Sequence, residues 1–190
     1  MTDIAKPWYA LRVKSNREWV TSEALLARGY SVCLPLYRVR GRRTDRVQMI
    51  DLPLFPGYLF CSFDVSNRLP ILTVPGVVHI VSVGRVPRSV DESEMAALFV
   101  VIKSGLPVIP TSYLPVGHRI LLDRGPLSGV EGVIVSHKNE DQLIVSVSLL
   151  QRSIAVEVDR HWIKPIVQGP NPQFIRTEQT GAIVCRNETL

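Results

Sequence analysis

The sequence predicts an α+β fold in two parts, a four-stranded antiparallel sheet with flanking helices followed by a small β-barrel. Three observations predict it. In the first half, strand-like alternation of apolar and polar residues gives way repeatedly to helical spacing. A proline-rich segment follows, and beyond it the chain contains short β-rich runs separated by turn residues. We therefore expect the 190 residues to divide into two small domains.

The first half predicts the element order β-α-β-β-α-β-α. Strands are predicted from alternation, and helices from apolar residues three or four apart. Gly29 is expected to end the first helix, and Asp91 to cap the start of the last one. The expected strands are 8–13, 31–39, 48–54 continuing into 57–63, and 77–83. The expected helices are 18–28, 67–73 and 91–103. The arginine-rich residues between 39 and 48 are predicted to form a hairpin or a mobile loop.

Proline marks the boundary between the two domains. Residues 104–115 contain three prolines, too many for a helix or a central strand, and predict a semi-rigid linker. The short β-rich runs beyond it are 119–122, 131–137, 143–149 and 154–158. They imply a barrel, because closure removes exposed sheet edges. We expect domains at 1–104 and 116–166, a linker at 105–115 and a flexible tail at 167–190.

The composition predicts a globular cytoplasmic protein without catalytic function. No apolar run approaches the roughly 20 residues of a membrane span, and the N-terminus lacks a signal-peptide pattern. The three cysteines are scattered and without metal-ligand spacing, so we expect no metal and no cofactor. The four histidines lie apart from nucleophile or carboxylate partners at any recognisable spacing, and there is no glycine-rich phosphate loop.

Positive charge is concentrated in one short segment. Residues 1–104 carry a net charge of +5, from 14 Lys/Arg and 9 Asp/Glu, whereas residues 105–190 carry 8 of each. Segment 38–46 alone has five arginines and one aspartate. The five are Arg38, Arg40, Arg42, Arg43 and Arg46. Arginine binds phosphate in bidentate geometry, so we interpret the segment as a nucleic-acid contact; the alternative is a loop kept soluble by its charge.

Closely spaced turn residues characterise the run 116–135. Gly125 and Gly129 permit tight turns, and Pro126 stiffens one of them. With its continuation over 143–163, this run resembles the KOW domain of NusG proteins, which implies a small SH3-like β-barrel.

Motifs in the first half resemble the same family. Trp8-Tyr9 opens the first strand, Leu54-Phe55-Pro56-Gly57-Tyr58-Leu59-Phe60 lies at the centre, and Val74-Pro75-Gly76-Val77 follows. Together these are similar to the NusG N-terminal domain, so the resemblance covers roughly residues 7–166 in the family's domain order. The tail and the arginine pattern lie outside it, and we expect a specialised paralogue.

The resemblance implies a transcription elongation factor. In the family, the N-terminal domain binds the clamp helices of RNA polymerase through an apolar surface, and the matching positions here are Phe55, Tyr58 and Phe60, with Tyr9 as a further candidate. The alternative is that these side chains fill the core, since strand alternation sends Tyr58 and Phe60 to one face. In such a factor, the arginine segment, whose pattern lies outside the resemblance, would contact DNA phosphates near the transcription bubble.

The resemblance also implies a second partner. NusG-like KOW domains bind Rho or a ribosomal small-subunit protein through positions that correspond to Leu127, Leu149, Leu150 and Arg152. Family members often carry an aromatic residue at the positions of Leu127 and Leu150, so leucine there favours the ribosome over Rho; the alternative is that these leucines complete the barrel core. We expect a monomer that modulates pausing and termination, in either direction. The alternative function is a ribosome-associated KOW protein that binds structured RNA.

Overall fold

The first half of the chain forms a four-stranded antiparallel sheet. The computed structural model describes residues 6–43, 46–112, 118–137, 140–165 and 182–184. In this sheet the strand order is β2-β5-β1-β6. The strands are β1 (Trp8–Val13), β2 (Ser31–Cys33), β5 (Tyr58–Ser62) and β6 (Val77–Ile80). A separate two-stranded hairpin joins β7 (Ser82–Val83) to β8 (Val86–Pro87).

The helices of the first half follow the predicted pattern. They are α1 (Glu18–Leu26), α2 (Leu69–Leu72) and α3 (Glu92–Ser104), with a 3-10 turn η1 (Val65–Asn67) before α2. The α3 helix begins at the expected cap, because the Asp91 carboxylate accepts a hydrogen bond from the Ser93 N–H at 2.9 Å. It ends at Gly105, whose φ of 66° is left-handed.

Alternation gives the first sheet two buried faces. On β1 and β5, Leu11 pairs with Leu59 and Ala10 pairs with Phe60. The α1 face carries Tyr9, Leu11, Val13, Leu59 and Cys61, and it shares a core cluster with residues of α1 and α2. The opposite side, which we call the α3 face, carries Trp8, Ala10, Arg12, Tyr58 and Phe60.

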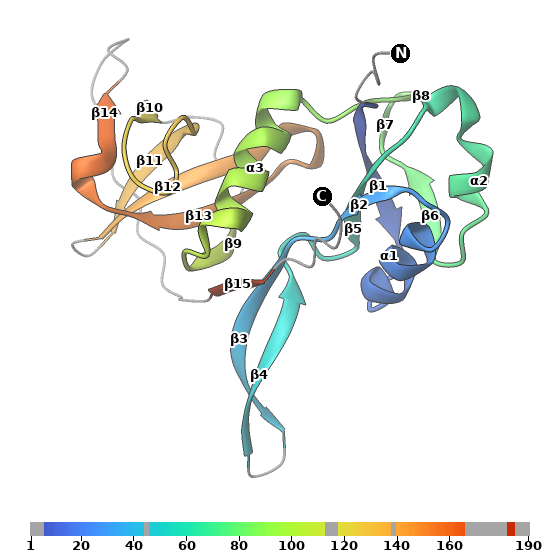
Figure 1. Ribbon diagram of the computed structural model, residues 1–190, viewed down its shortest axis with the longest axis horizontal. Coiled ribbons are helices and arrows are strands. Elements are labelled where there is room, and N and C mark those ends of the chain that lie inside the picture. Colours follow the sequence, from blue (N-terminus) through green and yellow to red (C-terminus); the bar gives the residue numbers. More distant parts are fainter. Residues whose placement is uncertain (1–5, 44–45, 113–117, 138–139, 166–181, 185–190) are drawn as a thin grey trace.

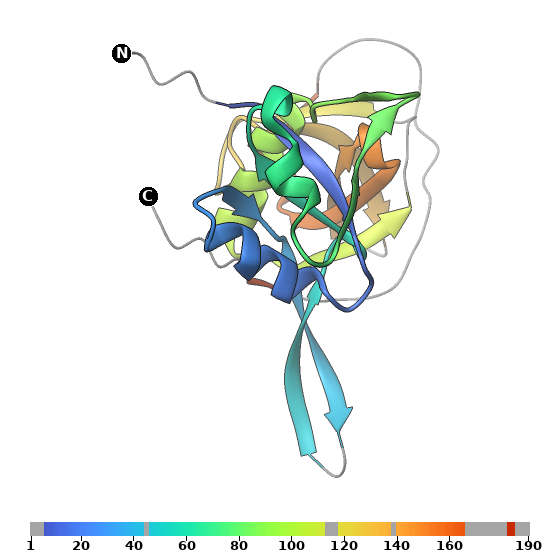
Figure 2. The ribbon, with the colours of Figure 1, turned by 90° about the vertical axis from the view of Figure 1, so that its right-hand side faces the viewer.

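A long hairpin extends from the body of the molecule (Figures 1 and 2). It consists of β3 (Leu36–Arg43) and β4 (Arg46–Pro53), and we call it the arginine ribbon. Of the two predicted alternatives for the arginine-rich segment, the structure has the hairpin. At its base, β15 (Ala182–Val184) pairs with Leu36–Arg38, so these three residues of the predicted flexible tail form a strand. The rest of 167–190 lies outside the described residues.

The second half forms a six-stranded antiparallel sheet with the order β14-β10-β11-β12-β13-β9. Its strands are β9 (Val108–Ser112), β10 (His118–Leu122), β11 (Glu131–His137), β12 (Glu140–Val147), β13 (Arg152–Val158) and β14 (Ile163–Pro165), with 3-10 turns η2 (Ser148–Leu150) and η3 (Arg160–Trp162). The predicted mixture of antiparallel sheets with few helices is confirmed, and closure into a barrel stays a prediction.

Strand β9 corrects the prediction of a linker over 105–115. Residues Val108–Ser112 pair with β13, and Pro110 lies opposite Ile154. An edge strand tolerates proline because one side of its backbone needs no partner strand, and β9 is at the end of the strand order. Residues 113–115 of the predicted linker lie outside the described residues.

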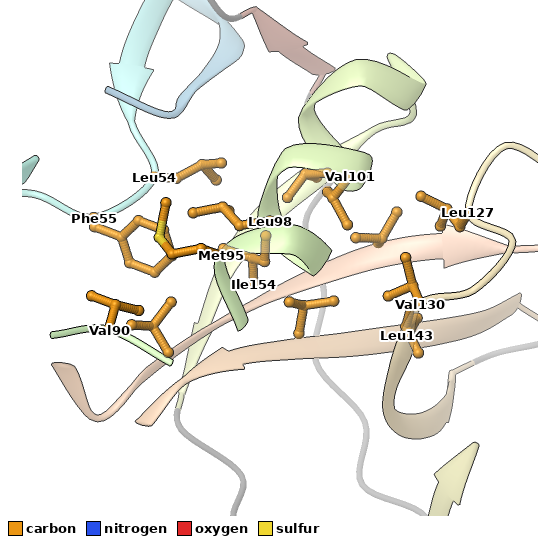
Figure 3. Packing of buried hydrophobic residues seen from close by; sticks show 14 of the residues in the cluster. Leu54, Phe55, Val90, Met95, Leu98, Val101, Leu127, Val130, Leu143 and Ile154 are labelled. Atoms are coloured by element: carbon orange, nitrogen blue, oxygen red, sulfur yellow. The ribbon is translucent and has the colours of Figure 1, made fainter. Parts of the chain in front are cut away.

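The two halves share one apolar core. A single cluster contains Phe55, Phe60 and Leu98 of the first half together with Leu127 and Ile154 of the second. The α3 helix lies between the first sheet and the second sheet (Figure 1), and Figure 3 shows Phe55 and Leu127 on opposite sides of Met95 and Leu98. The α3 face of the first sheet is therefore covered partly by residues of the second half.

Candidate functional site

The candidate site is built around the tight turn that joins β4 to β5. The Tyr58 N–H donates to the Phe55 carbonyl at 3.0 Å. Gly57 has a φ of 80° and follows Pro56, which are the features of a type II turn. Any Cβ at Gly57 would overlap the Arg12 guanidinium. Glycine is therefore favoured at this position by its backbone conformation, and any side chain there would also have to displace the Arg12 guanidinium.

The backbone of Gly57 is fixed by partners on both sides. Its N–H donates to Glu18 Oε1 at 2.8 Å, and its carbonyl accepts from the Val13 N–H at 2.9 Å. The Glu18 side chain is buried, although it belongs to the first turn of α1. A buried carboxylate needs such a donor to offset the loss of hydration. Glu18 is thus a supporting residue that pattern analysis missed, since an acidic residue in a first helical turn is ordinarily exposed.

Tyr58 contacts two arginines. The Arg12 Cζ is 4.8 Å from the centroid of the Tyr58 ring, and the Arg152 Cζ is 5.4 Å from it. Arg12 is the cross-strand partner of Tyr58, whereas Arg152 comes from β13 of the second half. Cation–π contacts in partly buried sites contribute roughly 0.5–2 kcal/mol each. Tyr58 therefore links the two halves of the molecule.

Two further aromatic side chains lie beside Tyr58 in the common core. Phe55 and Phe60 form an edge-to-face pair with ring centroids 5.6 Å apart, and they are 1% and 0% exposed. Trp8, also on the α3 face, packs against Phe99 of α3 at 5.2 Å. The structure therefore brings together Phe55, Tyr58 and Phe60 of the predicted polymerase site, under the cover of the second half.

Tyr9 does not join this group. Its side chain is buried on the α1 face, where the ring lies 4.8 Å from the ring of Phe63. Neighbouring residues of a strand point to opposite faces, so Tyr9 and Trp8 belong to different clusters. The structure separates Tyr9 from the other three predicted polymerase-binding residues.

The predicted partner site of the second half lies at the same contact. Leu127 and Leu150 are buried in the common cluster, Leu149 packs against it, and Arg152 contacts Tyr58. The contact also has a polar part. The Ser148 N–H donates to the two carboxylate oxygens of Glu94 at 3.1 and 3.2 Å. The two candidate binding surfaces thus meet at the Arg152–Tyr58 contact.

The arginine ribbon forms a second candidate site. Arg38 Nε donates to Asp51 Oδ1 at 2.8 Å, and this hydrogen bond and charge raise the pKa of Arg38. Arg40 is exposed. For Arg42, Arg43 and Arg46 the structure describes the strand positions and not the side chains. Arg38 is therefore already paired with a carboxylate.

Comparison with known proteins decides the family. Residues 6–99 match the family model described as transcription termination factor nusG. The chain belongs to the NusG family. It is 22% identical over 172 residues to the transcription termination/antitermination protein NusG of Rickettsia prowazekii (strain Madrid E), covering 84% of this chain and 90% of the relative. A solved structure on domain interaction in Thermotoga maritima NusG is similar at 23% identity and a TM-score of 0.49, covering 85% of this chain and 98% of the other.

This NusG-family chain is a transcription termination/antitermination factor. The matched region includes Phe55, Tyr58, Phe60, Arg12 and the arginine ribbon, and it ends within α3.

In the part of the chain that the structure describes, no helix is long and apolar enough to cross a membrane. In that same part, no group of three or more His, Cys, Asp or Glu side chains could hold a metal ion.

Proposed function

We propose that this factor binds the clamp helices of RNA polymerase through the α3 face of its first sheet. One observation carries the proposal: Phe55, Tyr58 and Phe60 gather where the cover comes partly from a separate half of the chain. Clustered aromatic side chains dominate the energetics of protein interfaces, and helices commonly dock on apolar grooves. The match of residues 6–99 to the NusG family supports this function over a ribosome-associated RNA-binding protein.

Binding in this way requires the second half to move. The contact between the halves includes the Arg152–Tyr58 and Glu94–Ser148 interactions, and polar contacts of this kind are typical of domain interfaces that separate. If opening costs about 2.7 kcal/mol, the apparent affinity for polymerase falls about 100-fold. The present arrangement is then a closed state, and polymerase selects the open one.

Once released, the second half is proposed to recruit a second partner. The residues for this contact are Leu127, Leu149, Leu150 and Arg152, and the partner is a ribosomal small-subunit protein or Rho. Tethering to polymerase raises the effective concentration of the second half near that partner. The factor acts in the cytoplasm as a monomer and breaks no covalent bond. It biases pausing and termination by stabilising one state of the polymerase.

The arginine ribbon is proposed to contact DNA near the transcription bubble. Each phosphate neutralised by an arginine releases counterions, which makes binding salt-dependent. This contact is independent of the closed state, because the ribbon extends away from the body of the molecule (Figure 2).

Polymerase binding is tested with the full chain and immobilised core enzyme by biolayer interferometry. Arg152→Ala removes one of the contacts that hold the second half in place, so we expect binding to tighten roughly 3- to 30-fold. Adding Tyr58→Ala to Arg152→Ala should then weaken binding tenfold or more, because an aromatic contact with polymerase is lost. Arg124→Ala, which removes an exposed arginine of the same half, is the control and should bind like the wild type.

Circular dichroism verifies the fold of each variant. If neither the wild type nor folded Arg152→Ala binds core enzyme, the polymerase proposal is wrong. Saturable binding to ribosomes by the same samples would then support the RNA-binding alternative.

A further inference from the structure

The register of the arginine ribbon divides its five arginines between two faces. Alternation along β3 assigns Arg38, Arg40 and Arg42 to one face, which we call the basic face. Their partners on β4 are Asp51, Met49 and Val47, in that order. Arg43 and Arg46 pair with each other near the tip, and alternation assigns them to the opposite face. The five arginines that are clustered in the sequence thus form two groups, one on each face of the ribbon.

The opposite face is occupied by its own apolar side chains. Ile50 packs across Gly41, where a Cβ would overlap the Ile50 side chain. Tyr37 packs against the common core at the base of the ribbon. Val39 and Ile50 are both half-buried. The basic face differs, because Arg40 is exposed and its partner Met49 is 52% exposed. The basic face therefore offers a ligand an exposed arginine beside an exposed apolar side chain.

Charge on the basic face is not spread evenly. Asp51 neutralises Arg38 through contacts of 2.8 and 3.5 Å. The next arginine on this face, Arg40, is exposed, and the strand position of Arg42 lies two residues further along, which is ~6.8 Å along a strand. That distance equals about two base-pair rises of a double helix at ~3.4 Å each. Two arginines at this interval suit a regular row of phosphates.

The ribbon has the shape for a duplex and lacks the chemistry for a single strand. Proteins that grip single strands stack the bases on aromatic side chains, and the ribbon sequence contains one aromatic residue, Tyr37, which packs against the core. A two-stranded ribbon fits the ~12 Å wide major groove of B-DNA, whereas the major groove of A-form RNA is too narrow for side chains to read. Strands of eight residues reach ~27 Å.

We propose that the arginine ribbon binds duplex DNA with its basic face, and that Arg40 and Arg42 make the phosphate contacts. This inference rests on the nucleic-acid part of the proposed function and names its ligand as a double helix. Arg43 and Arg46 contribute little, although they carry the same charge. Arg38 contributes little as long as it is paired with Asp51.

The test measures binding of the full chain to fluorescently labelled 20-base-pair DNA by anisotropy between 50 and 200 mM KCl. The single DNA strand and the RNA duplex of the same sequence serve as competing ligands. Arg40→Ala/Arg42→Ala and Arg43→Ala/Arg46→Ala are charge-matched, since each lowers the net charge by two. We expect the first pair to reduce the slope of log affinity against log salt by about 1.8 and the second to leave it near the wild-type value.

Asp51→Asn provides a test in the opposite direction. It frees Arg38 from its partner, so the slope should rise by about 0.9 and the affinity for duplex DNA should increase. Equal losses for the two double variants would overturn the assignment to the basic face. Tighter binding of the single strand or of duplex RNA would overturn the choice of duplex DNA. If the wild type binds none of the three ligands, the nucleic-acid part of the proposed function fails, while polymerase binding remains separately measurable.

Discussion

The two faces of the first sheet bury their side chains equally but are covered in different ways. Leu59 and Phe60 are neighbours on β5 and are both fully buried, the first on the α1 face and the second on the α3 face. The cover of the α1 face is local. Thr21 donates to the Pro75 carbonyl at 3.4 Å and Arg28 donates to the Pro70 carbonyl at 2.8 Å, which ties α1 to the α2 region. Burial alone therefore does not distinguish a core from a covered binding surface.

The source of the cover does distinguish them. On the α3 face, part of the cover comes from β13 and η2, about 90 residues further along the chain, and the contact includes a guanidinium and a carboxylate. Surfaces that separate reversibly have polar groups at their rim, and these groups can form hydrogen bonds with water after separation. We infer that the α3 face opens and the α1 face stays closed until the domain unfolds. Three predictions test this difference.

Gly57→Ala is expected to have the largest effect, because the turn at Gly57 serves both faces. The Glu18 carboxylate of α1 accepts a hydrogen bond from the Gly57 N–H, and the Arg12 guanidinium on the α3 face lies where the new Cβ would be placed. A side chain at φ 80° is strained, and Arg12 must also move from Tyr58. We expect the free energy of unfolding to fall by about 2–4 kcal/mol, measured by urea denaturation followed by circular dichroism.

Gly84→Ala is the matched control for this variant. Gly84 also has a positive φ, of 64°, but nothing lies within 4 Å of a Cβ there. This variant should lose only about 1 kcal/mol from backbone strain. The difference between the two variants then measures the contact with Arg12. Equal losses would mean that Arg12 moves aside without cost, and the turn would not connect the two faces.

The turn was predictable because its signals are local. Pro56 and Gly57 between two apolar strands indicate a tight turn, and Asp91 before apolar residues at helical spacing indicates the start of α3. Both features depend on residues close together in the chain, where backbone preference decides the conformation.

The contacts between the halves were not predictable in the same way. Strand alternation sends Tyr58 and Phe60 to one face, but no local pattern states that Arg152 meets Tyr58. The strand Val108–Ser112 was predicted as linker because its proline disfavours a central strand, and only pairing with β13 makes it an edge. Long-range packing decided each of these outcomes, and it also separated Tyr9 from the other candidates.

Glu94→Gln is expected to have a smaller effect, confined to the α3 face. The Glu94 carboxylate accepts the Ser148 N–H of the second half, and a charged acceptor contributes more than a neutral one. We expect the closed state to lose about 0.5–1.5 kcal/mol, which raises hydrogen exchange of the amides of α3 and η2 without changing that of α1.

Glu92→Gln is the control, because Glu92 and Glu94 both lie in the first turn of α3 and each change removes one negative charge. If Glu92→Gln raises exchange as much as Glu94→Gln does, the effect comes from the helix terminus and not from the contact between the halves.

The smallest effect concerns two cysteines that lie on opposite faces of the first sheet. Cys33 pairs with Phe60 and belongs to the common cluster, whereas Cys61 belongs to the cluster of the α1 face. Both are buried, and neither forms a disulfide. Burial raises the pKa of Cys61 to about 12, so at pH 8 its reactive thiolate is scarce even before access is considered.

Opening of the α3 face should expose Cys33 and leave Cys61 protected. In a Cys185→Ser background, we expect Cys33 to react with a disulfide reagent at pH 8 at least about tenfold faster than Cys61, because opening one face costs less than unfolding the domain. Arg152→Ala should accelerate Cys33 alone. The free energy of unfolding need not change in this variant, because the reaction rate of Cys33 reports the population of the open state. Equal rates for both thiols would mean that the two faces open together, and the α3 face would then be an ordinary core.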